Sequence, residues 1–171
     1  MSFYHLFDTV LGTCAIAWSP RGISRIVLPE ATRARTERRM RALLGGGVEA
    51  KPPRSVADAA RRVARHVAGR PQSFGDVELD MSGNAPFSRK VYRALRRVPA
   101  GKTVTYAELA KSAGSPGAAR AVGRAMAKNP FPIVVPCHRV LAASGKVGGF
   151  SAFGGAKTKR RLLSCEGVTV R

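Results

Sequence analysis

Acidic residues are scarce in this 171-residue chain. Ten Asp and Glu stand against thirty Lys and Arg, which gives a net charge of +20 at pH 7. The hydrophobic fraction of 44% is ordinary for a globular protein, so the charge excess does not indicate disorder. A positive field of this size favours a polyanionic partner, either nucleic acid or an anionic membrane surface.

Long apolar runs are also missing. No segment approaches the roughly 20 apolar residues that a membrane-spanning helix needs. The first residues, MSFYHLFDTVLG, lack the basic and apolar regions of a secretory signal. We therefore expect a soluble, cytoplasmic protein without membrane contact, and nucleic acid becomes the favoured partner.

The chain has few cysteines, and their number and spacing do not indicate disulfide pairs. The three residues Cys14, Cys137 and Cys165 are an odd number spread along the chain, which excludes a disulfide framework. No CxxC pair and no His/Cys cluster has the spacing of a zinc site. We expect neither a metal nor any other cofactor.

The first half of the chain has the pattern of a small sheet followed by helices. Residues 3–29 alternate apolar runs with turn signals at Leu11-Gly12 and Pro20-Arg21-Gly22, which predicts antiparallel strands. Basic amphipathic helices are predicted over residues 31–47 and 55–70, each stopped by glycine. A third candidate strand covers residues 74–81, and the polar segment 45–55 is interpreted as a loop.

Helix signals become sharper after residue 84. Pro86 is placed in a first turn, followed by an apolar stripe of Phe87, Val91 and Leu95. Thr105 and Glu108 have capping-box spacing at the start of a helix that closes on Gly114. The whole chain is thus predicted to be α+β, a small sheet-plus-helix domain followed by a mainly helical one.

A further helix is predicted to be capped by Ser115 and to start at Pro116, which would complete a helix-turn-helix with the helix before it. It is rich in small residues, and Arg120, Arg124 and Lys128 recur every four residues on one face. This combination suits insertion into a DNA groove. A tightly packed helix pair with exposed arginines explains it equally well.

Cys137 lies between Pro136 and His138, at the end of an apolar run that contains Ile133, Val134 and Val135. A thiolate is the reactive form of cysteine, and a neighbouring base is one way to generate it. On extended backbone, however, adjacent side chains point to opposite faces, so a turn or a bridging water is required. A buried, inert cysteine remains the alternative, and the glycine-rich segment 144–151 is either a hairpin turn or a close approach to a flat ligand.

The segment 97–151, with its PCHRV centre, the preceding NPFPI run and the AARAVGRAM helix, resembles the O6-alkylguanine-DNA alkyltransferases, or methylated-DNA–protein-cysteine methyltransferases. The resemblance is close over residues 79–171 and weak before them. It implies an N-terminal supporting domain over residues 1–78 and a DNA-binding, alkyl-transfer domain over residues 79–171. The implied partner is duplex DNA, bound as a monomer from the minor-groove side.

The same resemblance assigns roles to residues. Cys137 would accept the alkyl group from a flipped-out guanine in one irreversible step, and O4-alkylthymine would be a second substrate. His138 would take the thiol proton through a water, Glu166 would orient His138, and Tyr106 would assist the departing base. Arg120 would fill the space that the base leaves. The DNA-binding residues are further expected to include Ala119, Ala121, Gly123 and Arg124, and the substrate pocket Asn129, Met126, Pro132, Val140, Phe150, Ser151 and Lys159.

Some positions depart from the family pattern. Phe150 replaces a tyrosine of several relatives, and the segment after Ser151 is longer than in some of them. His5 and Cys14 do not reproduce the zinc ligands of other relatives. No additional phosphotriester-sensing domain is expected, which argues against a transcriptional activator.

Three rival functions are weaker. A non-catalytic protein that recruits excision repair to alkylated bases would lack the reactive cysteine that is present here. A cysteine hydrolase would explain neither the net charge nor the arginine-bearing helix. A helix-turn-helix regulator would need a dimer and a sequence-specific site.

Overall fold

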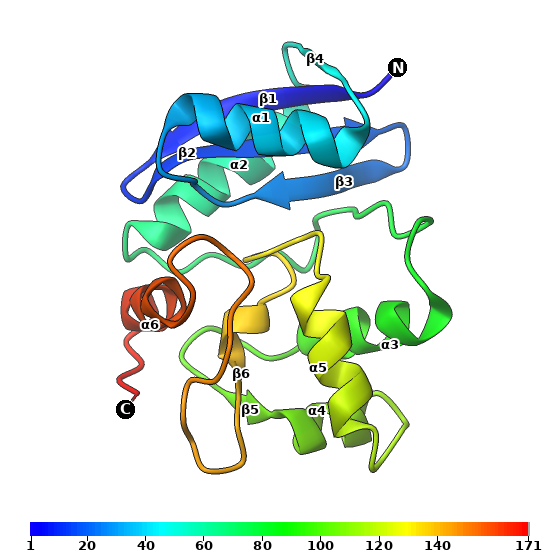
Figure 1. Cartoon of the computed structure of the whole chain (residues 1–171), viewed down its shortest axis with the longest axis vertical. Coiled ribbons are helices and arrows are strands. Elements are labelled where there is room, and N and C mark those ends of the chain that lie inside the picture. Colours follow the sequence, from blue (N-terminus) through cyan, green and yellow to red (C-terminus); the bar gives the residue numbers. More distant parts are fainter. Residues whose placement is uncertain (171) are drawn as a thin grey trace. The chain divides into compact units, whose positions relative to one another are not determined.

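The computed structural model describes residues 1–170, and the chain divides into two compact units, Met1–Ser82 and Gly83–Arg171 (Figure 1). The predicted α+β class is confirmed. Within the described residues, no helix has the length and apolar character needed to cross a membrane. The functional division at residues 78 and 79 stays a prediction.

The first unit is built on a four-stranded sheet with the order β3-β2-β1-β4. Its strands are β1 (Phe3–Thr9), β2 (Gly12–Ser19), β3 (Gly22–Val27) and β4 (Val48–Glu49). β1, β2 and β3 pair antiparallel, which confirms the predicted strands and both of their turns. The short β4 pairs parallel to β1 inside the segment that was expected to be a loop.

Two helices, α1 (Arg33–Leu44) and α2 (Arg54–Val67), cover opposite faces of this sheet (Figure 1). Met40 of α1 packs against Tyr4, Leu6 and their strand neighbours in one core. The central strand β2 is buried on both faces, because four consecutive residues from Cys14 to Ala17 have no exposed surface. The sequence of a strand that is covered on both faces is a continuous apolar run, without the alternation of apolar and polar residues seen in a half-exposed strand.

The third predicted strand, residues 74–81, is wrong. This segment is irregular and pairs with β3 only through an isolated bridge between Ile23 and Leu79. Two backbone bonds hold it, from Ile23 N–H to the Glu78 carbonyl and from Asp80 N–H to the Ile23 carbonyl. The alternation of apolar and polar residues over 74–81 is weak, and the pairing with β3 does not extend beyond the single bridge.

Residues 83–170 of the second unit contain four α-helices and one short parallel pair of strands. The helices are α3 (Pro86–Leu95), α4 (Tyr106–Ser112), α5 (Ala119–Ala127) and α6 (Ala156–Cys165). The strands β5 (Val104–Thr105) and β6 (Val140–Leu141) pair in register. This pairing brings the start of α4 next to the segment that follows Cys137, which lies in the 3-10 turn η1 (Cys137–Arg139).

The capping box at α4 is confirmed, since Thr105 and Glu108 exchange both of its hydrogen bonds. The predicted start of the following helix at Pro116 is wrong. Gly117 adopts a φ of +85°, a left-handed conformation through which a right-handed helix does not run. The helix α5 therefore begins at Ala119, and Ser115 closes a turn with Ala118 N–H in place of capping a helix.

Gly22, at the start of β3, provides a test of how residues 78–80 are held. Its φ is +131°, and a Cβ atom at this position would lie 2.5 Å from the Glu78 carbonyl oxygen. We expect Gly22→Ala to lower the free energy of unfolding by about 2 kcal/mol or more, from backbone strain and the clash together. Urea denaturation followed by circular dichroism measures this.

The matched control is Gly75→Ala in the same segment, where no heavy atom lies within 4 Å of the new Cβ. It should change the unfolding free energy by less than about 0.5 kcal/mol. Equal effects of the two substitutions would contradict the close packing of β3 on residues 78–80.

Candidate active site

Cys137 begins a single turn of 3-10 helix. Its N–H donates to the Val135 carbonyl at 2.8 Å, and Arg139 N–H donates to the Pro136 carbonyl at 2.9 Å. The turn replaces the extended backbone on which Cys137 and His138 would point to opposite faces. The side chains of Cys137, His138 and Arg139 are all buried.

The loop before Cys137 is held by Asn129. The Asn129 Nδ2 group donates to the Val135 carbonyl at 2.8 Å, while its Oδ1 accepts from Phe131 N–H at 2.9 Å. Within this loop Ile133 has a φ of +74°, the only positive value of a non-glycine residue among residues 1–170. For a β-branched residue this conformation costs on the order of 1–3 kcal/mol, which the surrounding packing must offset.

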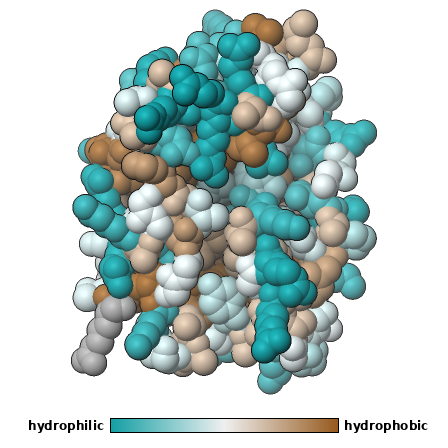
Figure 2. Space-filling model, viewed as in Figure 1, coloured by the Kyte–Doolittle hydropathy of each residue, from teal (hydrophilic) through white to brown (hydrophobic). Residues whose placement is uncertain are grey.

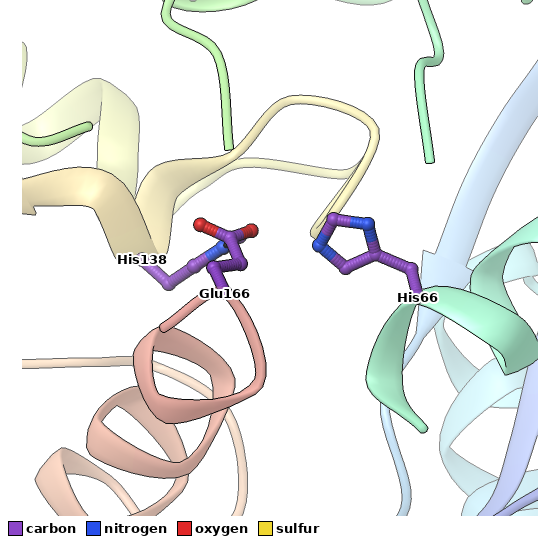
Figure 3. Close-up of side chains that lie close together, drawn as sticks. All are labelled: His66, His138 and Glu166. Carbon is purple, nitrogen blue, oxygen red and sulfur yellow. Dashed lines mark hydrogen bonds and ion pairs between the residues drawn. The ribbon is translucent and has the colours of Figure 1, made fainter. Parts of the chain in front are cut away.

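A buried carboxylate, Glu166, lies against the same turn. Its side chain has no exposed surface, and its Oε1 lies 2.7 Å from His138 Nε2 (Figure 3). Because an ionised carboxylate only accepts hydrogen bonds, the ring proton of a neutral His138 is on Nε2. The lone pair of the imidazole is then on Nδ1, the nitrogen with which His138 can act as a base.

Arg139 is the second partner of Glu166. Its Nε donates to both carboxylate oxygens, at 2.9 and 3.2 Å, and its Nη2 donates to Oε1 at 2.7 Å. The remaining Nη1 donates to the Val98 carbonyl at 2.6 Å. This guanidinium compensates the buried negative charge, since an isolated buried carboxylate is strongly disfavoured. Sequence reasoning missed this role, although a charged residue between buried apolar residues on both sides was a signal that it needed a partner.

Cys137 lies at the wall of a cavity of about 300 Å³. Five of the residues named from the sequence line this cavity with Cys137: Tyr106, Met126, Phe150, Ser151 and Lys159. Gly123, assigned to DNA contact, also lines it, as do Ala127 and Gly149, which were not anticipated. The remaining three expected pocket residues do not line the cavity: Asn129 holds the loop, Pro132 bridges to Val135, and Val140 offers its carbonyl to Lys159.

Lys159 is a buried lysine whose amino group is fixed by backbone oxygens. It donates to the Val140 carbonyl at 2.5 Å and approaches the Gly149 carbonyl at 3.5 Å. Burial lowers the pKa of Lys159, and attraction to a Cys137 thiolate acts in the opposite direction. The lysine thereby joins β6 to the glycine-rich segment on the other side of the cavity.

Opposing influences act on the Cys137 thiol. Burial raises its pKa, and against this act a hydrogen bond from Asn129, the positive charge of Lys159 and the backbone N–H groups of Cys137 and His138. Burial also raises the pKa of Tyr106, with a smaller contribution from the nearby Cys137. Tyr106 is therefore a neutral hydrogen-bond donor at physiological pH.

The outer face of α5 is basic and formed on small residues. Arg120, Arg124 and Lys128 are exposed, and Ala119, Ala121 and Gly123 are half-buried. In the space-filling view, hydrophilic residues gather over the region where Figure 1 draws α5 (Figure 2). This face is next to the cavity, since Gly123, Met126 and Ala127 line it.

Comparison with known proteins identifies similar sequences and folds. The profile of the family described as "6-O-methylguanine DNA methyltransferase, DNA binding domain" matches residues 86–168. A methylated-DNA–protein-cysteine methyltransferase of Mycolicibacterium paratuberculosis is 48% identical over 114 residues, 67% of each chain. The constitutive methylated-DNA–protein-cysteine methyltransferase of Bacillus subtilis is 34% identical and covers 100% of this chain and 99% of its own.

Solved structures agree with these sequence matches. The crystal structure of Mycobacterium tuberculosis OGT in complex with DNA has a TM-score of 0.74 and 34% identity, covering 96% of this chain and 92% of its own. The O6-methylguanine-DNA methyltransferase from Pyrococcus kodakaraensis has a TM-score of 0.75 and 30% identity over 98% of this chain and 100% of its own.

Replacing Arg139 tests the buried charge cluster. Arg139→Met leaves the Glu166 carboxylate buried without its cation, so we expect a loss of about 3–5 kcal/mol in unfolding free energy. Arg139→Lys keeps the charge but not the forked geometry and should lose less. Urea denaturation gives these values, with the exposed Arg93→Met as control. A loss for Arg139→Met no larger than for Arg93→Met would refute the role of the pair.

Lys159→Met tests the electrostatics of the thiol. Removing a positive charge that lowers the pKa of Cys137 should move the pH profile of Cys137 alkylation by iodoacetamide to higher pH. Mass-spectrometric peptide mapping follows the modification of each cysteine separately. Cys165, whose pKa is not influenced by Lys159, serves as the internal control for a general change in structure. An unchanged Cys137 profile would exclude an electrostatic contribution from Lys159.

Proposed function

Because this chain belongs to the O6-methylguanine-DNA methyltransferase family, it is a DNA repair enzyme that takes the alkyl group from alkylated guanine in duplex DNA, and we propose that Cys137 is the residue that receives the group. The assignment of Cys137 as the acceptor is supported by one observation. Cys137 lines a cavity of about 300 Å³ and directly precedes His138, which is oriented by a buried carboxylate.

The proposed reaction is a direct displacement. The sulfur of Cys137 attacks the alkyl carbon on guanine O6, an S–C bond forms, and the C–O bond breaks with its electrons leaving on the base. The thiol proton passes to His138 Nδ1, through a water as the family resemblance implies. Since a thioether is not hydrolysed, each molecule reacts once.

Glu166 and Arg139 act on this reaction through His138. The carboxylate fixes the imidazole tautomer and stabilises the positive charge that His138 acquires on taking the proton. Tyr106 is proposed to donate a hydrogen bond to the departing guanine, which carries developing negative charge. Its raised pKa keeps the proton on the phenol for this purpose.

The pocket and the neighbouring helix account for access to the base. We propose that α4 and α5 act as a helix-turn-helix, with the small residues of α5 allowing a close approach to the minor groove. Arg120 would occupy the space of the flipped-out base, and Met126, Phe150, Ser151 and Lys159 would surround that base in the cavity. A reactive thiol that works on DNA fits the reducing cytoplasm of the cell, which we propose as its location.

The recruiting-protein alternative is not favoured, because the nucleophile that such a protein lacks is present at Cys137. A hydrolase would need to release its acyl or alkyl group. Lesion-specific binding alone does not separate these functions, so the decisive property is the covalent transfer.

Intact-protein mass spectrometry after incubation with a duplex containing one O6-methylguanine tests the assignment. The wild-type chain should gain a single methyl group and stop there, while Cys137→Ser gains none and still binds the lesion. Methylation that persists in Cys137→Ser, or that exceeds one group per molecule, would show that another residue is the acceptor or that the protein turns over. Peptide mapping identifies the modified cysteine in either case.

A further inference from the structure

The positive charge of this protein is concentrated in its second half. Residues 83–171 contain seventeen Lys and Arg but only two Asp and Glu, whereas residues 1–82 contain thirteen and eight. Protein surfaces normally mix charges of both signs. The second half departs far from that mixture, and a polyanion is the partner that such a surface attracts.

Neither carboxylate of the second half forms an ion pair with a surface Lys or Arg among residues 83–170. Glu166 is buried against Arg139, and Glu108 accepts from Thr105 N–H at 2.8 Å in the capping box. The first half shows the contrast, because four of its surface arginines have carboxylate partners. These ion pairs join Arg33 to Asp8, Arg39 to Glu30, Arg61 to Asp58, and Arg62 to both Asp58 and Asp76.

Helix α3 carries a basic stripe that the alkyl-transfer reaction does not use. Lys90 and Arg93 are exposed and lie three residues apart on the helix, so they share one face, and Arg97 is exposed in the turn that follows Leu95. None of the ion pairs in residues 1–170 involves them. We call these three residues the α3 stripe.

The α3 stripe faces away from α5. The opposite face of α3 is buried, with Val91, Tyr92 and Leu95 in the core, and Tyr92 O–H donates to the Ala125 carbonyl of α5 at 2.8 Å. Helix α5 in turn buries Val122, Ala125 and Met126 and exposes its own basic residues. Since each helix packs its apolar face inward, a duplex lying on α5 leaves the α3 stripe uncovered.

We propose that the α3 stripe is a second DNA-binding surface, independent of sequence and lesion, that holds the phosphate backbone of a duplex segment other than the one whose base enters the cavity. The proposal rests on the assignment of α5 as the helix that binds the damaged duplex. Contacts from flexible Lys and Arg side chains to phosphates position a protein without reading bases. Two such surfaces on one molecule allow it to pass directly from one duplex segment to another while it searches for damage.

A two-duplex binding experiment tests this. Full-length Cys137→Ser is first saturated with a short duplex carrying O6-methylguanine and one fluorophore. A lesion-free duplex with a second fluorophore is then titrated in, and energy transfer between the labels reports simultaneous binding. We expect the second duplex to bind, and the triple substitution Lys90→Gln, Arg93→Gln, Arg97→Gln to weaken that binding at least about tenfold. The slope of log Kd for the second duplex against log salt concentration should become shallower by about 0.9 for each phosphate contact that is lost.

The control removes three positive charges from the first half of the chain, with Arg35→Gln, Arg38→Gln and Arg54→Gln. These residues are exposed and take part in none of the side-chain ion pairs of residues 1–170. Equal weakening by both triple variants would reduce the effect to net charge and overturn the proposal. The proposal would also be overturned if no second duplex bound. The same holds if the α3 stripe variant lost as much affinity for the lesion duplex as for the second duplex.

Methyl transfer separates this proposal from the assignment of the active site. With Cys137 intact, the α3 stripe variant should methylate itself from a short lesion duplex at the wild-type rate. A wild-type chain that bound two duplexes without accepting a methyl group would refute the role of Cys137 and leave the second surface standing.

Discussion

The carboxylate of Glu166 ties the end of α6 to the turn that carries Cys137. Through Arg139, which also donates to the Val98 carbonyl, it joins three segments that lie far apart in the sequence. A buried ion pair adds little net stability compared with apolar packing, because both charges lose their hydration. Its contribution here is positional, since the same oxygen that accepts from Arg139 also fixes the ring of His138.

The loop before Cys137 is held in place at a cost in backbone energy. Ile133 is held in a left-handed conformation. The Asn129 side chain bonds to Phe131, which precedes Ile133, and to Val135, which follows it. Strain of this kind persists where the surrounding contacts over-determine it, and it is concentrated at functional sites. For the proposed transfer to Cys137, this places the sulfur before the base arrives, which removes an entropic part of the barrier. Lys159 extends this rigidity to the other wall of the cavity through the Val140 carbonyl.

Local chemistry could be predicted from the sequence, and long-range geometry could not. The capping box of Thr105 and Glu108 and the turns of the first sheet depend on residues close together, so their patterns were sufficient. The start of α5 was misplaced because Pro116 is a good first-turn residue, while the left-handed Gly117 that breaks the helix has no unique signature. The role of Glu166 came from the family resemblance, since a carboxylate 28 residues from His138 is not placed against it by any local pattern. Arg139 was missed because a CHR triplet does not reveal what its arginine meets.

The uneven distribution of charge between the two halves of the chain has a cost in stability. Residues 83–171 carry seventeen basic and two acidic side chains, and the repulsion among these positive charges lowers the stability of the second unit when no polyanion is bound. Pairing those residues with surface carboxylates, as the first half does, would relieve the repulsion but would also weaken the attraction to phosphates. Of the two carboxylates that remain, one is in a helix cap and one is in the buried cluster. The second unit thus keeps acids where folding and catalysis require them and leaves the surface to DNA.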